Sequence, residues 1–276
     1  MKKKKKSLIA GDVLGIFFTC IIFIIPFLFM VVNSLKERRE ANLLSLSLPE
    51  IFKWENYKEV LTAGNGIVLT AFKNSLLLTL GSVIILIITG AMSGYVLQRR
   101  KDRPMRMINA VVLAGLMVPP AILPTISMMQ TLHVYKTLFG MILIEVALQT
   151  PFTIMLYRGF MSSIPIELEE AGCIDGCNRI KMFTGVIFPL LKPVTATVVI
   201  LNAVTIFNDF TNPLYFLPGS KNSTVQLTLY TFMGQFSSSY NLLFANVVVI
   251  TVPMLILFVF FNKRIVDGMV AGAVKG

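Results

Sequence analysis

Four carboxylates gather in one polar stretch, residues 163–193, which reads SIPIELEEAGCIDGCNRIKMFTGVIFPLLKP. Glu167, Glu169 and Glu170 follow Pro165, which fits the first turn of a helix because its missing N–H is not needed there. Negative charge is favoured at that end of a helix by the helix dipole. This spacing predicts a short acidic helix whose chemistry is that of a docking surface for another protein.

The residues after the acidic run predict where this helix ends. Gly176 offers a left-handed stop, and Asn178 is suited to cap a second helix that starts at Arg179. Ala171 and Gly172 are small, so the backbone of another protein has room to approach that face. We therefore expect a short helix, a glycine turn and a second helix that continues into a membrane span.

The same stretch resembles the EAA loop of ABC-importer permeases, and its carbohydrate-importer version in particular. The matched residues keep a fixed register: Ile164-Pro165, Glu167-Leu168-Glu169, Glu170-Ala171-Gly172, Asp175-Gly176, Phe183, Ile187, Pro189 and Pro193. Two positions depart from the family pattern, since Gly172 replaces the second alanine and Cys177 replaces the small residue after Asp-Gly. Both remain small, so close approach is preserved. The alternative to a docking loop is an ordinary solvated loop between two spans.

The resemblance implies an all-α membrane protein of six transmembrane helices, with the type I ABC-importer fold and a cytoplasmic coupling helix. It implies a second, similar permease subunit, two ATPase subunits that hold ATP and magnesium, and an extracellular solute-binding protein. It also implies alternating access driven by the ATPases. The residues that the resemblance assigns to ATPase coupling are Glu167, Glu170, Ala171, Gly172, Asp175, Gly176 and Phe183.

Composition independently predicts a polytopic membrane protein. Of the 276 residues, 55% are hydrophobic and only 14% are charged, against about 25% charged in soluble domains. The net charge of +11 does not indicate nucleic-acid binding, because the basic residues lie beside hydrophobic spans. Three cysteines make no disulfide framework, and a single histidine argues against a metal site.

Six hydrophobic stretches are long enough to cross a bilayer of about 30 Å. They cover about residues 13–32, 74–97, 107–129, 138–156, 186–209 and 242–261. The first is too long for the core of a signal peptide, and we expect it to be retained. The second contains Gly90-x-x-x-Gly94, which permits close helix packing. The third is interrupted by Pro119, Pro120 and Pro124, either as a kinked lining of the pathway or as a purely structural kink.

Basic residues predict the orientation of these spans. The N-terminal tail, the 98–106 loop, the 157–185 loop and the C-terminal tail carry 16 Lys and Arg, against 7 in the remaining connecting segments. By the positive-inside rule both termini lie in the cytoplasm, and the resemblance implies a bacterial cell membrane. We divide the chain into residues 1–69 (tail, first span and external segment), 70–265 (the permease core with the 163–193 loop) and 266–276 (tail).

Polar residues inside or beside the spans are candidates for a substrate pathway, because a charge at bilayer depth is costly. Carboxylates and amides near aromatic rings suit a sugar, which offers hydroxyls and an apolar ring face. The candidates are Glu145, Gln149, Asn208, Asp209 and Asn212. The structural alternatives are a hydrogen bond between helices for Glu145 and a hydrated interfacial cap for Asp209.

No Walker-type phosphate loop, nucleophile elbow or metal-ligand motif occurs, so the sequence predicts no catalytic residue and no cofactor bound by this chain. The most consistent function is a permease subunit that imports a carbohydrate, such as a sugar, an oligosaccharide or a related polyol. The alternatives are a membrane-embedded enzyme and a secondary carrier that works without an ATPase.

Overall fold

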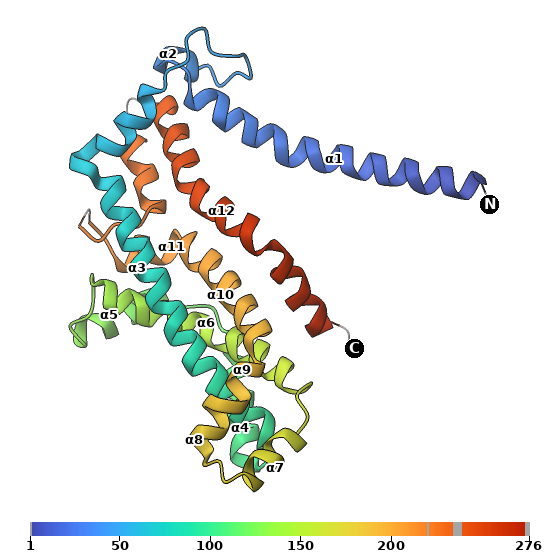
Figure 1. The fold of residues 1–276 in the computed structure, drawn as a ribbon. Helices are drawn as coiled ribbons and strands as arrows, with labels where there is room; N and C mark the ends of the chain where they lie inside the picture. Colours follow the sequence, from blue (N-terminus) through green and yellow to red (C-terminus); the bar gives the residue numbers. More distant parts are fainter. Residues whose placement is uncertain (1, 220, 234–238, 274–276) are drawn as a thin grey trace. The chain divides into compact units, whose positions relative to one another are not determined.

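The structure is a computed structural model and describes residues 2–219, 221–233 and 239–273, which form helices and no β-strand (Figure 1). The helices, in chain order, are α1 (Lys2–Ser34), α2 (Arg38–Ala41), α3 (Glu55–Arg99), α4 (Arg103–Ala114), α5 (Ile122–Thr131), α6 (Leu138–Met161), α7 (Glu167–Ile174), α8 (Arg179–Lys181), the π-helix η1 (Met182–Ile187), α9 (Phe188–Leu190), α10 (Lys192–Phe207), α11 (Thr211–Phe216), the 3₁₀-helix η2 (Gln226–Phe232) and α12 (Tyr240–Ala273).

Four of these helices are long and apolar enough to cross a membrane. They contain the segments Gly15–Ser34, Glu55–Arg99, Leu138–Met161 and Tyr240–Phe260. A fifth span is formed if the helical segments Arg179–Leu190 and Lys192–Phe207 are taken together, although they are bent by 74°. Four predicted spans therefore correspond to long helices, and the fifth is bent. Helix α12 continues to Ala273, so most of the predicted C-terminal tail is helical.

The third predicted span, 107–129, is not a single helix. Helix α4 ends at Ala114 and α5 begins at Ile122, so the two have only 12 and 10 residues, too short to cross alone. The reason is local: Pro119 and Pro120 cannot donate backbone hydrogen bonds and push the residues before them out of the helical region. The prolines end the helix here instead of kinking it.

Helix α3 contains a sharp break close to its start. Gly64, Asn65 and Gly66 have φ angles of 55°, 56° and 77°, and Ala63 is extended. Glycine takes this left-handed conformation readily because it has no Cβ. The first turns of α3, and α2 before it, lie within the predicted external segment between the first two spans, so that segment is partly helical.

The chain divides into two compact units, Met1–Leu69 with Leu227–Pro253, and Thr70–Gln226 with Met254–Gly276. The first contains a buried lysine. Lys36 is fully buried and its Nζ donates hydrogen bonds to the Ser45 carbonyl at 2.8 Å and to the Ser45 and Ser47 hydroxyls at 3.1 and 3.3 Å. Asn56 donates to the Ser34 and Lys36 carbonyls. These bonds hold the loop between α2 and α3 against the end of α1.

The second unit is built on α3, α6 and α10. Gly90 and Gly94 of α3 face α6 so closely that a Cβ on Gly94 would stand 2.7 Å from the Tyr157 Cβ and 3.0 Å from the Arg158 backbone nitrogen. On Gly90 a Cβ would stand 2.5 Å from Thr153 Cγ2. The close packing predicted from Gly90-x-x-x-Gly94 is therefore confirmed, and α6 is the partner. One buried cluster at this contact joins α3 and α6 to the 163–193 loop and to α10; it consists of Ala91, Tyr157, Met161, Ile164, Met182, Ile187, Leu191, Val194 and Val198.

Candidate functional site

The 163–193 loop folds as a short helix, a tight turn and a second, irregular helix. Helix α7 starts with Glu167 and has all three of its glutamates in the first turn. It ends in a Schellman turn: the Cys177 N–H donates to the Gly172 carbonyl at 2.9 Å and the Gly176 N–H donates to the Cys173 carbonyl at 3.1 Å. Gly176 has φ +78°. The left-handed stop predicted at Gly176 is confirmed.

The second helix begins as predicted but does not run straight into a span. The Asn178 Oδ1 accepts a hydrogen bond from the Lys181 N–H at 2.9 Å, which confirms the predicted cap. Residues 182–187 then adopt a π-helix, and the chain bends by 74° before α10. Pro189 and Pro193 lie on either side of the bend, and each removes one backbone donor from the helical ladder.

Helix α7 has one face free and the other packed on its own chain. Glu167, Glu170, Ala171 and Ile174 are all exposed, Ile174 to 87%. Their spacing of i, i+3, i+4 and i+7 places them in one stripe on the helix. We call these four residues the free face of α7. It presents two carboxylates, a methyl group and an apolar side chain to a partner, and Asp175 and Gly176 are exposed just beyond it.

The opposite face of α7 packs inward. Gly172 is buried, and a Cβ there would stand 2.6 Å from Met182 Cε and 3.1 Å from Met182 Sδ. The Phe183 ring contacts the rings of Tyr95 and Phe188, with centroids 5.6 and 5.9 Å apart. The seven residues predicted for coupling therefore separate into five exposed ones and two, Gly172 and Phe183, that hold the loop together.

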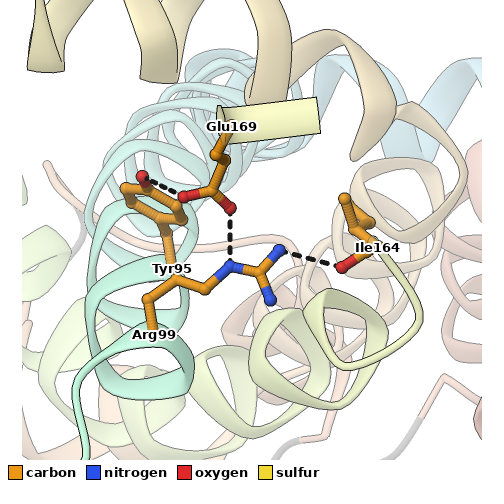
Figure 2. A network of polar contacts seen from close by, with 4 residues as sticks. All are labelled: Tyr95, Arg99, Ile164 and Glu169. Carbon is orange, nitrogen blue, oxygen red and sulfur yellow. Dashed lines mark hydrogen bonds and ion pairs between the residues drawn. The ribbon is translucent and has the colours of Figure 1, made fainter. Parts of the chain in front are cut away.

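Glu169 also points inward, although it stands between exposed acidic residues. Its Oε1 accepts a hydrogen bond from the Arg99 Nε at 2.6 Å, and its Oε2 accepts one from the Tyr95 hydroxyl at 2.8 Å (Figure 2). Arg99 also donates from Nη2 to the Ile164 carbonyl at 2.9 Å. The predicted coupling set leaves out Glu169, but the sequence analysis predicted no inward contact for it. The available signal was Tyr95 and Arg99, an i, i+4 pair on one face of the helix before the loop.

Further polar contacts join helices at the Arg99 end of α3, where α4, α7 and α8 gather (Figure 1). Arg158, near the end of α6, donates to the Gln98 Oε1 at 3.3 Å and to the Asn109 Oδ1 of α4. On the connection between α3 and α4, Arg100 pairs with Asp102 at 3.0 Å, and this hydrogen bond lowers the pKa of the Asp102 carboxyl. Gln98 and Arg99, adjacent residues of α3, thus contact α6 and α7 respectively.

Residues 86–270 match the family of binding-protein-dependent transport system inner membrane components. The chain belongs to this family. The predicted resemblance to carbohydrate ABC-importer permeases is confirmed by relatives along almost the whole length of the protein.

Two such relatives show how far the similarity extends. The melibiose/raffinose/stachyose import permease protein MelC of Bacillus subtilis is 32% identical over 279 residues, covering 99% of each chain. A probable starch degradation products transport system permease protein, AmyC of Thermoanaerobacterium thermosulfurigenes, is 30% identical over 257 residues, covering 92% of this chain and 93% of AmyC.

The fold of this transport component is that of a solved importer. A chain of a bacterial ABC transporter involved in the import of alginate superposes with a TM-score of 0.82, covering 95% of this chain and 97% of that one, at 20% sequence identity. With the family match and the relatives above, this shows a multi-pass membrane transport component.

The five pathway candidates of this permease lie on α6, just after α10 and on α11. Glu145 is 1% exposed about two turns from the start of α6. Its Oε1 has no hydrogen-bond partner among the described residues, and Asp209 is its charged neighbour. Asp209 accepts hydrogen bonds from the Asn212 N–H at 3.2 Å and from its side-chain amide at 2.6 Å. Asn208 accepts one from the Gln226 amide at 3.1 Å, and Gln149 is half-buried. The structure therefore brings Glu145 and Asp209 together.

Proposed function

We propose that this chain is a transmembrane subunit of an ATP-driven importer that moves a carbohydrate into the cytoplasm, and that α7 is the point where an ATPase subunit docks. The observation that carries this proposal is the free face of α7. An eight-residue helix, fixed on one side by its own chain, offers two carboxylates and an exposed isoleucine on the other side. An exposed isoleucine beside two carboxylates on a fixed helix suits docking against a partner that offers an apolar pocket with a basic rim.

The chemistry of the free face indicates how the ATPase would bind. An apolar side chain that is exposed in the free protein acts as an anchor once a partner pocket covers it, and Ile174 is well placed for this. The Glu167 and Glu170 carboxylates would pair with basic groups at the rim, which fixes the register of the helix in its cleft. Ala171 between them leaves room for close approach of the partner backbone.

The proposed mechanism is alternating access. ATP and magnesium bind to two partner ATPases, their closure displaces α7, and the displacement turns the pathway between inward-facing and outward-facing states. The pathway is formed with a second, similar permease, and an extracellular binding protein delivers the solute. In this arrangement the chain contributes six membrane crossings, the third made by α4 with α5 and the fifth by the bent segment, with both termini in the cytoplasm.

A carbohydrate is the substrate class favoured by the named relatives and by the polar residues on α6 and between the end of α10 and α11. Glu145, Gln149, Asn208, Asp209 and Asn212 would offer carboxylates and amides to the hydroxyl groups of a sugar. The name of a relative supports this assignment, since MelC is named for melibiose, raffinose and stachyose import.

The experiment that tests this function is sugar uptake by the assembled complex in sealed proteoliposomes, with and without enclosed ATP. We expect uptake only with ATP. The variant Glu170→Lys, which reverses a charge on the free face, should abolish uptake while the protein remains in the membrane. Glu59→Lys, the same change at an exposed residue outside the loop, should transport normally. Uptake that needs no ATP, or normal uptake by the Glu170→Lys variant, would refute the proposal.

A further inference from the structure

One glutamate of the acidic run, Glu169, already binds side chains of its own chain. Both Glu169 carboxylate oxygens accept hydrogen bonds, one from Arg99 and one from Tyr95, and the two side chains of the ion pair are only 14% and 18% exposed. Among the described residues, the ion pairs are this one and Arg100–Asp102. Glu167 and Glu170, by contrast, are exposed. Because each oxygen already accepts a hydrogen bond and the side chain is largely buried, Glu169 is poorly placed to meet a partner.

These contacts join segments that are far apart in the sequence. Tyr95 and Arg99 lie on consecutive turns of α3, 74 and 70 residues before Glu169. Arg99 binds the Glu169 side chain and, through Nη2, the Ile164 carbonyl just before α7 (Figure 2). We call Tyr95, Arg99 and Glu169 the latch. These bonds hold both α7 and the segment just before it, so they oppose rotation or sliding of α7.

The latch also reaches the other side of the loop. The Tyr95 ring that donates its hydroxyl to Glu169 packs against the Phe183 ring of η1, 5.6 Å away. Helix α7 in turn packs on η1 through Gly172 and Met182. The end of α3 is thus the common support of the two halves of the loop, although the backbone of the loop continues into α6 and α10 and not into α3.

We propose that Glu169 is a positioning residue that transmits motion and not a contact for the ATPase. The latch ties α7 to the Arg99 end of α3, so a displacement of α7 is delivered to α3 as well as to the helices covalently joined to the loop. This inference rests on the proposed function and deepens it. The ATPase binds the free face of α7, and the inward face of α7 moves α3 through the latch. A charge-assisted pair with a second hydrogen bond on the same carboxylate is suited to this, because it fixes direction as well as distance.

The test is a charge swap in the complete complex. Arg99→Glu and Glu169→Arg each place two like charges in the latch, and the double variant restores an opposite pair. We expect both single variants to keep the ATPase bound during purification but to lose uptake per ATP hydrolysed by roughly tenfold or more, since truncating or reversing one member of a largely buried pair leaves the other unpaired. The double variant should recover most of the loss. Tyr95→Phe should show a smaller loss.

The matched control is Glu170→Arg, the same change one residue along on the free face. It should lose the ATPase itself, and adding Arg99→Glu should not rescue it. If Glu169→Arg loses the ATPase as Glu170→Arg does, and the swap recovers nothing, Glu169 is an ATPase contact and the proposal is overturned. Normal uptake per ATP in either single latch variant would also overturn it.

A second measurement separates the latch from the proposed function. In a background with the three native cysteines replaced by serine, a spin label attached through Ile174→Cys reports the mobility of α7 without any ATPase. Glu169→Gln should free the label, and the charge swap should restrain it again. If the wild type transports without ATP, the proposed function fails whatever the label does. If the label is equally restrained in Glu169→Gln, the latch does not hold α7 and this inference fails by itself.

Discussion

The close contact between α3 and α6 at Gly94 predicts how much stability is lost when a larger residue replaces the glycine. Replacing Gly94 with alanine places a Cβ 2.7 Å from the Tyr157 Cβ and 3.0 Å from the Arg158 backbone nitrogen. Carbon atoms meet without repulsion at about 3.5–4.0 Å, so α6 has to move away by most of an ångström. No rotamer change relieves the clash, because the opposing atoms belong to the backbone and to a Cβ.

Overpacking of this kind costs about 1–3 kcal/mol. For a chain of this size that corresponds to a fall in melting temperature of roughly 3–10 °C. The shift also displaces Arg158 from Gln98 and Asn109, so the Arg99 end of α3 should loosen with it. The assay is thermal unfolding of the complex purified in detergent, followed by the loss of the monodisperse peak in size-exclusion chromatography.

The matched control is Gly159→Ala, on α6 just beyond the contact. A Cβ at Gly159 meets nothing within 4 Å in the part of the chain that the structure describes. Since alanine favours a helix over glycine by about 1 kcal/mol, this variant should be as stable as the parent or more so. If Gly94→Ala and Gly159→Ala melt at the same temperature, the close approach of α3 and α6 is wrong.

Two further substitutions probe the turn after α7 and the buried lysine. Gly176 has φ +78°, and a Cβ there would meet nothing within 4 Å, so a substitution costs free energy only through the backbone conformation. Retention of the ATPase should fall in the order asparagine, alanine, valine, because a β-branched residue resists positive φ most. Equal retention in the asparagine and valine variants would contradict this. Lys36→Ala removes a buried side chain and three hydrogen bonds. It should lower the free energy of unfolding by about 2 kcal/mol or more, measured as a lower melting temperature. The control Lys58→Ala, at an exposed residue, should melt like the parent.

Local signals in the sequence predicted the local structure well. Gly176 ends α7, Asn178 caps the next helix, and Gly90 and Gly94 receive a neighbouring helix, because each of these effects depends on a residue and its near neighbours. The long apolar runs likewise predicted α1, the later part of α3, α6 and α12. The family resemblance then supplied the class of transporter, which composition alone did not.

What the sequence did not predict depends on tertiary contacts. Pro119 and Pro120 were expected to kink a third span, and they end a helix instead. The bend before α10 requires a π-helix that no hydrophobic pattern reveals. Glu169 and Glu170 are adjacent and chemically identical, and only the position of Arg99 and Tyr95 determines that one turns inward while the other stays exposed. Contacts between residues 70 or more positions apart in the sequence, such as these, are not predicted by a local sequence pattern.

The most direct test of the central claim, that α7 receives the ATPase in the cytoplasm, is the side of the membrane from which Cys173 reacts. Cys173 lies on α7 and is exposed, so with Cys20 and Cys177 replaced by serine it is a single reporter. A membrane-impermeant maleimide should label it in inside-out vesicles and leave it unlabelled in sealed protoplasts. Labelling of intact protoplasts would place the docking helix outside the cell and contradict the account.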